Sequence, residues 1–337
     1  MKPTRRYLIV GPAWVGDMVM AQSLFKTIRQ RNPAALIDVL APEWSLPLLG
    51  RMPEVNEAIA LPVQHGQLAL LTRYRLGRQL RHRGYTHAIV LPRSAKAALV
   101  PFFARVPLRT GFRGELRYGL INDMRQLDKT MLVQTVQRMV ALGMPAEATQ
   151  PANIPEPRLA INADNQQRLF EKLGLQLDRP VIGMMPGAAY GPAKQWPVAS
   201  FHRLATQLIQ SGYQVWVFGS ASEAGLGEQI AEAGQAVRSL CGQTELVDAI
   251  DLLALCKAAV SNDSGLMHVA AACEIPLVAL YGSSTPAYTP PLSDRAQIVY
   301  LGLDCSPCFR RRCPLGHTRC LVDMTVEQVH AALDRAT

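Results

Sequence analysis

The sequence predicts an α/β protein with two doubly wound domains. In both halves of the chain, short apolar runs typical of buried parallel strands alternate with segments of helical periodicity. A proline-rich stretch without periodicity, residues 144–157, separates the halves and is interpreted as a linker. A length of 337 residues suffices for two domains of ordinary size. Each domain is therefore expected to be Rossmann-like.

The first half begins with a strand that breaks at a glycine. Strands are expected at residues 7–10, 36–40 and 87–91, and helices at 17–31 and 68–83. The turn GPAWVGDMVM (residues 11–20) carries Trp14 and Val15 where a dinucleotide-binding loop has glycines. It ends on Asp17, a carboxylate that would repel a phosphate. This turn is therefore expected to serve a purpose other than dinucleotide binding, or to hold an ordinary first-turn helix acid.

The second half repeats the alternation. Strands are expected at 181–185, 214–218, 258–260 and 277–280, and helices at 197–211, 222–233, 245–256 and 325–336. The first domain is assigned to residues 1–157 and the second to residues 158–320. Residues 321–337 are expected to form a C-terminal helix, and the first domain is the candidate surface on which it packs. Because doubly wound sheets bind ligands at the carboxyl ends of their strands, we expect a ligand cleft between the two domains.

Two loops of the second half follow predicted strands and carry residues suited to an anion. In VIGMMPGAAYGPAKQWP (residues 181–197), small residues would let backbone N–H groups approach a diphosphate, and Lys194 would neutralise it. The other interpretation is a surface loop with one solvated lysine. Both loops lie at carboxyl ends of strands in one predicted sheet, which favours a shared binding site.

The second of these loops is SNDSGLMHVAAA (residues 261–272). Ser264 and Gly265 would present free N–H groups of a helix start to a phosphate. Asp263 is interpreted either as the helix N-cap or as an acceptor for a sugar hydroxyl. His268 lies one turn into the helix, either as a ligand contact or as a satisfied helix histidine.

The charge of the chain is concentrated in its first half. Residues 1–160 hold 22 Lys/Arg and 10 Asp/Glu, whereas residues 161–337 hold 13 and 16, which accounts for the net charge of +9. The basic residues of this half include Arg73, Arg75, Arg78, Arg81, Arg83, Arg105, Arg109, Arg113 and Arg117. The asymmetry indicates a nucleic acid, a membrane surface or a phosphorylated substrate as partner, or a solvated basic face without one. No run of about 18 apolar residues is present, and no signal-peptide cleavage site follows the start, so a cytoplasmic protein is expected.

The seven cysteines fall into two groups. Cys241, Cys256 and Cys273 lie in apolar contexts and are expected to be buried small hydrophobes. Cys305, Cys308, Cys313 and Cys320, with His317 between them, contain one C-x2-C knuckle instead of the two that structural zinc sites usually use. We therefore expect a loop without metal and with reduced thiols, dispensable for chemistry, and keep zinc as the alternative.

The opening GPAWVGDMVM, the loop PGA…K-x-W-P and the loop NDSGLMHVAAA together resemble the ADP-heptose:lipopolysaccharide heptosyltransferases over essentially the whole chain. The segment CSPCFRRRCPLGHTRC resembles the cysteine-rich segment of one subgroup. The resemblance implies a GT-B fold, with an acceptor domain and a donor domain facing a central cleft. It implies inverting transfer of L-glycero-D-manno-heptose from ADP-heptose to the first heptose of the inner core, heptosyl-Kdo2-lipid A.

The resemblance also implies roles for single residues. The catalytic base falls on Asp17, and the donor-binding residues fall on Lys194, Glu223, Asp263, Ser264, Gly265 and His268. Candidate acceptor contacts are Arg73, Arg75, Arg78, Arg109, Arg113 and Arg117. No cofactor and no metal are expected, since the chain contains no D-x-D motif. A polyanionic acceptor in a membrane implies peripheral binding at the anionic inner leaflet, without nucleic acid as a partner.

Three other functions remain as alternatives. A dehydrogenase would fit two Rossmann-like halves but not the missing glycine fingerprint. A nucleic-acid-binding protein would fit the basic half, although interleaved aromatic residues are absent from it. A glycosyltransferase of the same fold that uses another nucleotide sugar is the nearest alternative, since no residue identifies the sugar directly.

Overall fold

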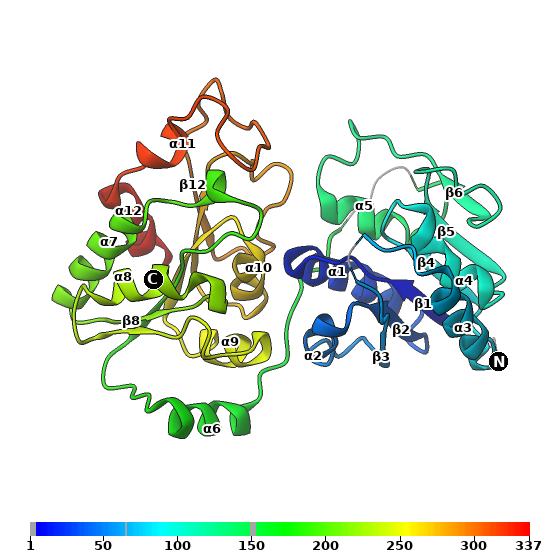
Figure 1. Cartoon of the computed structure of the whole chain (residues 1–337), viewed down its shortest axis with the longest axis horizontal. Coiled ribbons are helices and arrows are strands. Elements are labelled where there is room, and N and C mark those ends of the chain that lie inside the picture. Colours follow the sequence, from blue (N-terminus) through cyan, green and yellow to red (C-terminus); the bar gives the residue numbers. More distant parts are fainter. Residues whose placement is uncertain (1–4, 65, 149–152) are drawn as a thin grey trace. The chain divides into compact units, whose positions relative to one another are not determined.

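The computed structural model describes residues 5–64, 66–148 and 153–337. The chain divides into two compact units, Met1–Pro157 and Arg158–Thr337. Each unit is a six-stranded parallel sheet with helices on both faces (Figure 1). None of the helices in the described ranges has the length and apolar character needed to cross a bilayer.

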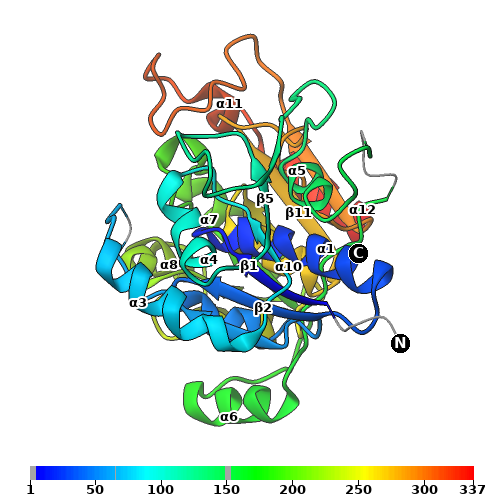
Figure 2. The same cartoon turned by 90° about the vertical axis from the view of Figure 1, so that its right-hand side faces the viewer.

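The first sheet has the strand order β3-β2-β1-β4-β5-β6. Its strands are β1 (Arg6–Val10), β2 (Leu36–Ala41), β3 (Glu57–Ala60), β4 (His87–Val90), β5 (Leu108–Phe112) and β6 (Asp123–Arg125). Its helices are α1 (Val15–Arg31), α2 (Leu46–Leu49), α3 (Leu70–Leu80), α4 (Leu99–Phe103) and α5 (Thr135–Ala141). Helix α1 packs against α5, and α3 packs against α4 (Figure 2).

The second sheet repeats this topology with the order β12-β11-β10-β7-β8-β9. Its strands are β7 (Val181–Met185), β8 (Gln214–Val217), β9 (Val237–Ser239), β10 (Ala258–Asn262), β11 (Leu277–Tyr281) and β12 (Ala296–Tyr300). Its helices are α6 (Ala163–Leu173), α7 (Val198–Gln210), α8 (Ala224–Ala231), α9 (Leu246–Leu253), α10 (Gly265–Ala272), α11 (Arg319–Val322) and α12 (Val326–Ala336). The strands that were predicted from apolar runs are all present in the two sheets.

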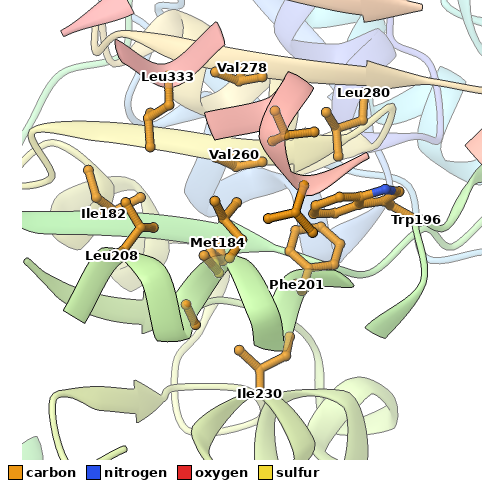
Figure 3. Close-up of a cluster of buried hydrophobic side chains, with 14 of the residues drawn as sticks. Ile182, Met184, Trp196, Phe201, Leu208, Ile230, Val260, Val278, Leu280 and Leu333 are labelled. Atoms are coloured by element: carbon orange, nitrogen blue, oxygen red, sulfur yellow. The ribbon is translucent and has the colours of Figure 1, made fainter. Parts of the chain in front are cut away.

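The C-terminal helix belongs to the core of the second unit. Helix α12 lies on β10, β11 and β12 of the second sheet and against α7. Val329 and Leu333, almost completely buried, join the apolar cluster that Figure 3 shows. Trp196 lies in the same cluster and donates its indole N–H to the carbonyl of Met324 at 2.9 Å. The apolar stripe of α12 therefore completes the core of the second unit.

The predicted linker is only partly described. Helix α5 ends at Ala141 with a short turn, and among the described residues the next helix is α6, which begins at Ala163. Residues 149–152, which belong to this segment, lie outside the described residues. The boundary between the two units falls between Pro157 and Arg158, at the end of the stretch.

Candidate functional site

In the second unit, the two predicted anion-binding loops meet where the strand order reverses. Strands β7 and β10 are parallel neighbours, and the helices after them run to opposite sides of the sheet. In a doubly wound sheet this reversal opens a crevice at the carboxyl ends of the strands, which is where ligands bind. The loop with Lys194 follows β7, and the loop with Asp263 follows β10.

Lys194 and Asp263 contact each other across this point. The Lys194 ammonium donates to Asp263 Oδ2 at 2.5 Å, and the Ser284 hydroxyl, which follows β11, donates to the same oxygen. The two charged side chains are 16% and 5% exposed. The N-cap of α10 is Ser264, so the interpretation of Asp263 as the N-cap is wrong. Its carboxylate instead fixes the position of a lysine 69 residues away in sequence.

Asn262 links the same two loops through the backbone. Its buried side-chain carbonyl accepts from the Trp196 N–H at 3.0 Å, and its amide group donates to the Pro186 carbonyl at 2.6 Å. Both ends of the loop that carries Lys194 are thereby anchored to the end of β10. Asn262 was not among the predicted site residues, although its position directly before Asp263 was a usable signal.

His268 lies in α10 within electrostatic range of the ion pair. Burial lowers the pKa of His268 to about 4; Asp263 opposes this effect and Lys194 adds to it. The imidazole is therefore neutral at pH 7 and offers one N–H donor and one acceptor nitrogen.

Ser264 and Gly265 begin α10 and are half-buried. Ser264 has an extended backbone and its hydroxyl makes no capping hydrogen bond. The first amide groups of a helix lack intrahelical acceptors, and together with the helix dipole they favour an anion. This is the arrangement that the sequence predicted for a phosphate.

Glu223 also lies at this edge of the sheet. One carboxylate oxygen, Oε2, accepts from the N–H of Ser220 at 2.7 Å and from its hydroxyl at 2.8 Å. The other oxygen lies against Gly187, where an added Cβ would come within 1.7 Å of it. The structure thus places Glu223 beside the loop that carries Lys194.

In the first unit, Asp17 lies at the carboxyl end of a central strand, as Lys194 and Asp263 do in the second unit. It lies in the first turn of α1, after β1, and is half-buried. Strand β4 is the parallel neighbour of β1 at the reversal of strand order, and the exposed Arg93 follows it. Arg113 follows β5 and is exposed at the same edge. Arg93 was missed, although its place after a predicted strand was a signal.

Three of the six candidate acceptor arginines are held by the protein itself. Arg117 is completely buried and donates to the carbonyls of Pro92 and Phe112. Arg73 is buried and donates to the Leu68 carbonyl at 2.7 Å.

Arg109 donates to three carbonyl groups, those of Val106, Gly119 and Leu120. A guanidinium that satisfies backbone carbonyls has a structural role, so these three side chains are less available to an acceptor, and acceptor binding by any of the six arginines stays a prediction. Arg75, Arg78 and Arg113 are exposed and remain candidates.

The cysteines show two kinds of environment. Cys241 and Cys256 are buried as predicted, and burial raises the pKa of Cys241 to about 11. Cys273 is only partly buried. Across the part of the chain that the structure describes, no three His, Cys, Asp or Glu side chains are arranged to hold a metal ion, and the prediction of a segment without metal stays untested.

The family of the chain is shown by its similarity to known proteins. The model of glycosyltransferase family 9 (heptosyltransferase) matches residues 73–319, which is well over half of the chain. The chain belongs to this heptosyltransferase family. It is therefore an enzyme, a glycosyltransferase of lipopolysaccharide biosynthesis, as the sequence predicted.

Relatives within the family cover nearly the whole chain. The chain is 47% identical to lipopolysaccharide heptosyltransferase 2 of Escherichia coli, with 96% of each chain covered, and 47% identical to that of Salmonella typhimurium, with 97% and 98% covered. The solved E. coli ADP-heptose lps heptosyltransferase II has a TM-score of 0.87 at 44% identity, with 98% of both chains covered. A family 9 glycosyltransferase from Veillonella parvula, at 20% identity and a TM-score of 0.85, has the same fold.

These comparisons confirm the predicted family, its heptosyltransferase II subgroup and the GT-B type of fold. They favour a glycosyltransferase over the dehydrogenase and nucleic-acid-binding alternatives.

Proposed function

We propose that the chain transfers L-glycero-D-manno-heptose from ADP-heptose to the first heptose of the lipopolysaccharide inner core, with inversion at the anomeric carbon. The observation that carries this proposal is the Lys194–Asp263 pair at the strand-order reversal of the second sheet, beside the start of α10. A cation and a helix N-terminus at one edge suit the diphosphate of a nucleotide sugar. The relatives at 47% identity, named heptosyltransferase 2, support heptose as the sugar.

Asp17 is assigned the general base. In an inverting displacement, the acceptor hydroxyl attacks the anomeric carbon, its proton passes to a base, and the bond from that carbon to the diphosphate oxygen breaks. ADP leaves with the electron pair of this bond, and a new glycosidic bond forms on the opposite face of the sugar. Asp17 suits the role because it lies in the first turn of α1, where the helix dipole favours the ionised carboxylate.

The residues of the second unit are assigned to the donor. Lys194 and the first amide groups of α10 at Ser264 and Gly265 bind the diphosphate and stabilise the charge that develops on it as it leaves. Asp263 holds Lys194 in place and accepts from a sugar hydroxyl. His268, neutral through burial, donates a hydrogen bond to the same region.

Glu223 is assigned to the ribose hydroxyls. Its position beside Gly187 supports this role, because the carboxylate lies at the edge where the nucleoside would extend from the diphosphate. No cofactor or metal takes part in the proposed reaction, since the protein's own cation and amide groups offset the diphosphate charge.

The donor proposal is tested by ligand-induced thermal stabilisation. A ligand that binds only the folded state stabilises it by RT ln(1 + L/Kd), where L is the free ligand concentration, so at one ligand concentration a tighter ligand raises the melting temperature more. ADP-heptose and ADP are expected to stabilise the protein, whereas UDP- and GDP-sugars at the same concentration are not. Stabilisation by another sugar nucleotide in place of ADP-heptose would favour the alternative glycosyltransferase.

We further propose that the first unit binds the anionic cytoplasmic leaflet of the membrane that carries the acceptor. Residues 58–114 contain ten Lys/Arg and no Asp or Glu. On α3 and α4 this stretch exposes apolar side chains between its arginines, with Leu70 51%, Leu71 58% and Phe102 40% exposed. Basic residues beside exposed apolar ones are the composition of surfaces that bind anionic lipid.

A hollow of about 430 Å³ lies next to this surface. It is lined by Arg81, Phe102, Phe103, Arg105, Val106, Pro107 and Arg109. Its apolar walls beside the exposed Arg105 suit a lipid headgroup phosphate with the start of its acyl chains.

Vesicle sedimentation tests the membrane proposal. The protein is expected to sediment with vesicles that contain phosphatidylglycerol, and not with pure phosphatidylcholine vesicles. Leu71→Ser and Phe102→Ser should each weaken sedimentation several-fold, while Leu177→Ser, at an exposed leucine of the second unit, serves as the matched control. Equal sedimentation of all four proteins, or capture by DNA with the same salt dependence, would contradict the proposal.

A further inference from the structure

The cysteine-rich segment, residues 305–320, is attached to the donor-side edge of the second sheet. The Ser306 hydroxyl donates to the Gly282 carbonyl, and the Phe309 N–H donates to the Ser283 carbonyl at 2.7 Å. Gly282 and Ser283 directly precede Ser284, whose hydroxyl contacts Asp263. The segment is therefore fixed to the loop that supports the Lys194–Asp263 pair.

The same segment also contacts the loop that carries Lys194. The Tyr190 hydroxyl donates to the Phe309 carbonyl at 2.7 Å, and the Ala193 N–H donates to the Arg311 carbonyl at 3.2 Å. At Gly191, which has a φ of 150°, an added Cβ would come within 2.5 Å of that carbonyl oxygen. Glycine is thus required for this close approach of the two backbones.

These contacts bring a second cation to Lys194. The Arg311 guanidinium carbon lies 5.5 Å from the centre of the Tyr190 ring, and the Lys194 ammonium lies 5.0 Å from the same centre. Two cations share one aromatic ring, which holds both by cation–π attraction. Lys194 is partly neutralised by Asp263, whereas Arg311 is exposed and makes no ion pair within the described ranges.

We propose that Arg311 is a second cation of the donor diphosphate subsite, and that the cysteine-rich segment serves to present it. The inference rests on the proposed ADP-sugar donor. The leaving diphosphate gains negative charge as its bond to the sugar breaks, and a lysine already paired with a carboxylate offsets only part of it. A guanidinium adds a planar pair of donors that matches two phosphate oxygens. The role belongs to the Arg311 side chain, and the prediction that the thiols of the segment are dispensable for chemistry stays a prediction.

Binding of ADP and adenosine to Arg311→Ala tests the inference. The matched control is Arg312→Ala, which removes the same charge from the neighbouring exposed position. Arg311→Ala is expected to weaken ADP binding about tenfold or more, the loss typical of one charge-assisted contact. Adenosine has no phosphate, so its affinity should stay unchanged. Arg311→Lys should bind ADP with intermediate affinity, and Arg312→Ala should bind ADP like the wild type.

Three results would overturn the inference about Arg311 without affecting the proposed donor. One is wild-type ADP affinity in Arg311→Ala; another is an equal loss in Arg312→Ala, which would indicate a general effect of charge. An equal loss of adenosine affinity would also overturn it, because the damage would then lie outside the diphosphate. If the wild-type protein bound no ADP at all, the proposed donor would fail and the inference with it.

Discussion

Substitution of Lys194 has two separable consequences, because the residue both pairs with Asp263 and faces the proposed diphosphate. Lys194→Ala leaves the Asp263 carboxylate 5% exposed, with the Ser284 hydroxyl as a remaining donor. Removing one partner of a buried ion pair costs about 3–5 kcal/mol. The Lys194 side chain is 16% exposed, so solvent screening reduces the expected loss to about 2 kcal/mol.

This loss lowers the melting temperature of the second unit by roughly 4–8 °C, given the size of that unit. ADP affinity should fall about tenfold or more, because a charged contact to the diphosphate disappears. The double variant Lys194→Ala/Asp263→Ala removes the unpaired charge together with its partner. It should therefore recover most of the stability while ADP affinity stays low.

Differential scanning fluorimetry and calorimetric titration with ADP measure the two effects on the same samples. If the double variant regained both stability and ADP affinity, Lys194 would only neutralise Asp263 and would not contact the donor. If Lys194→Ala changed neither quantity, the ion pair would be irrelevant to both, and the reasoning on burial would be refuted.

Three further predictions concern other residues. Asp17→Asn should lower kcat by about a hundredfold or more, with donor affinity and melting temperature nearly unchanged; retained turnover would remove Asp17 from the mechanism. Because burial lowers the pKa of His268 from 6.5 to about 4, the unfolded state binds more protons between these values, and the protein loses stability as the pH falls. Urea unfolding should show that His268 lowers the free energy of unfolding by about 2 kcal/mol between pH 7 and pH 5. The His268→Gln variant should lose correspondingly less over this range. Equal pH dependence of the wild type and the variant would contradict this prediction. Arg117→Ala should cost about 3 kcal/mol or more without raising the acceptor KM, whereas Arg113→Ala should raise that KM; the opposite pattern would show that Arg117 binds acceptor.

The sequence predicted strands β1, β2, β4, β7, β8, β10 and β11, but neither β5 nor the edge strands of either sheet. Central strands such as β7 and β10 are buried on both faces and therefore read as continuous apolar runs. The edge strands β6 and β12 are half-buried, with polar residues among the apolar ones, so no periodicity marks them. The packing partner of α12 was also not predictable, because an apolar stripe shows that a helix packs but not on what.

The site could be located from the sequence, while its contacts could not. Loops at the ends of predicted parallel strands were expected to meet, and Lys194 and Asp263 do so. Which partner each charged group takes depends on distances that a sequence does not contain. Arg117 illustrates this, since a buried arginine that binds carbonyl groups looks the same in sequence as an exposed one. Arg311 was not predicted as a site residue for a related reason. It lies near Lys194 because the Ala193 N–H donates to the Arg311 carbonyl, and these two residues are 118 positions apart in the sequence.

Heptose transfer by the purified protein tests the central claim most directly. The measurement is the mass and anomeric configuration of the product formed from ADP-heptose and heptosyl-Kdo2-lipid A. The account predicts an acceptor that is heavier by a single heptose, joined with inversion, with ADP released in equal amount. A product with retained configuration, or an unchanged acceptor in the presence of ADP-heptose and a changed one with another sugar nucleotide, would contradict it.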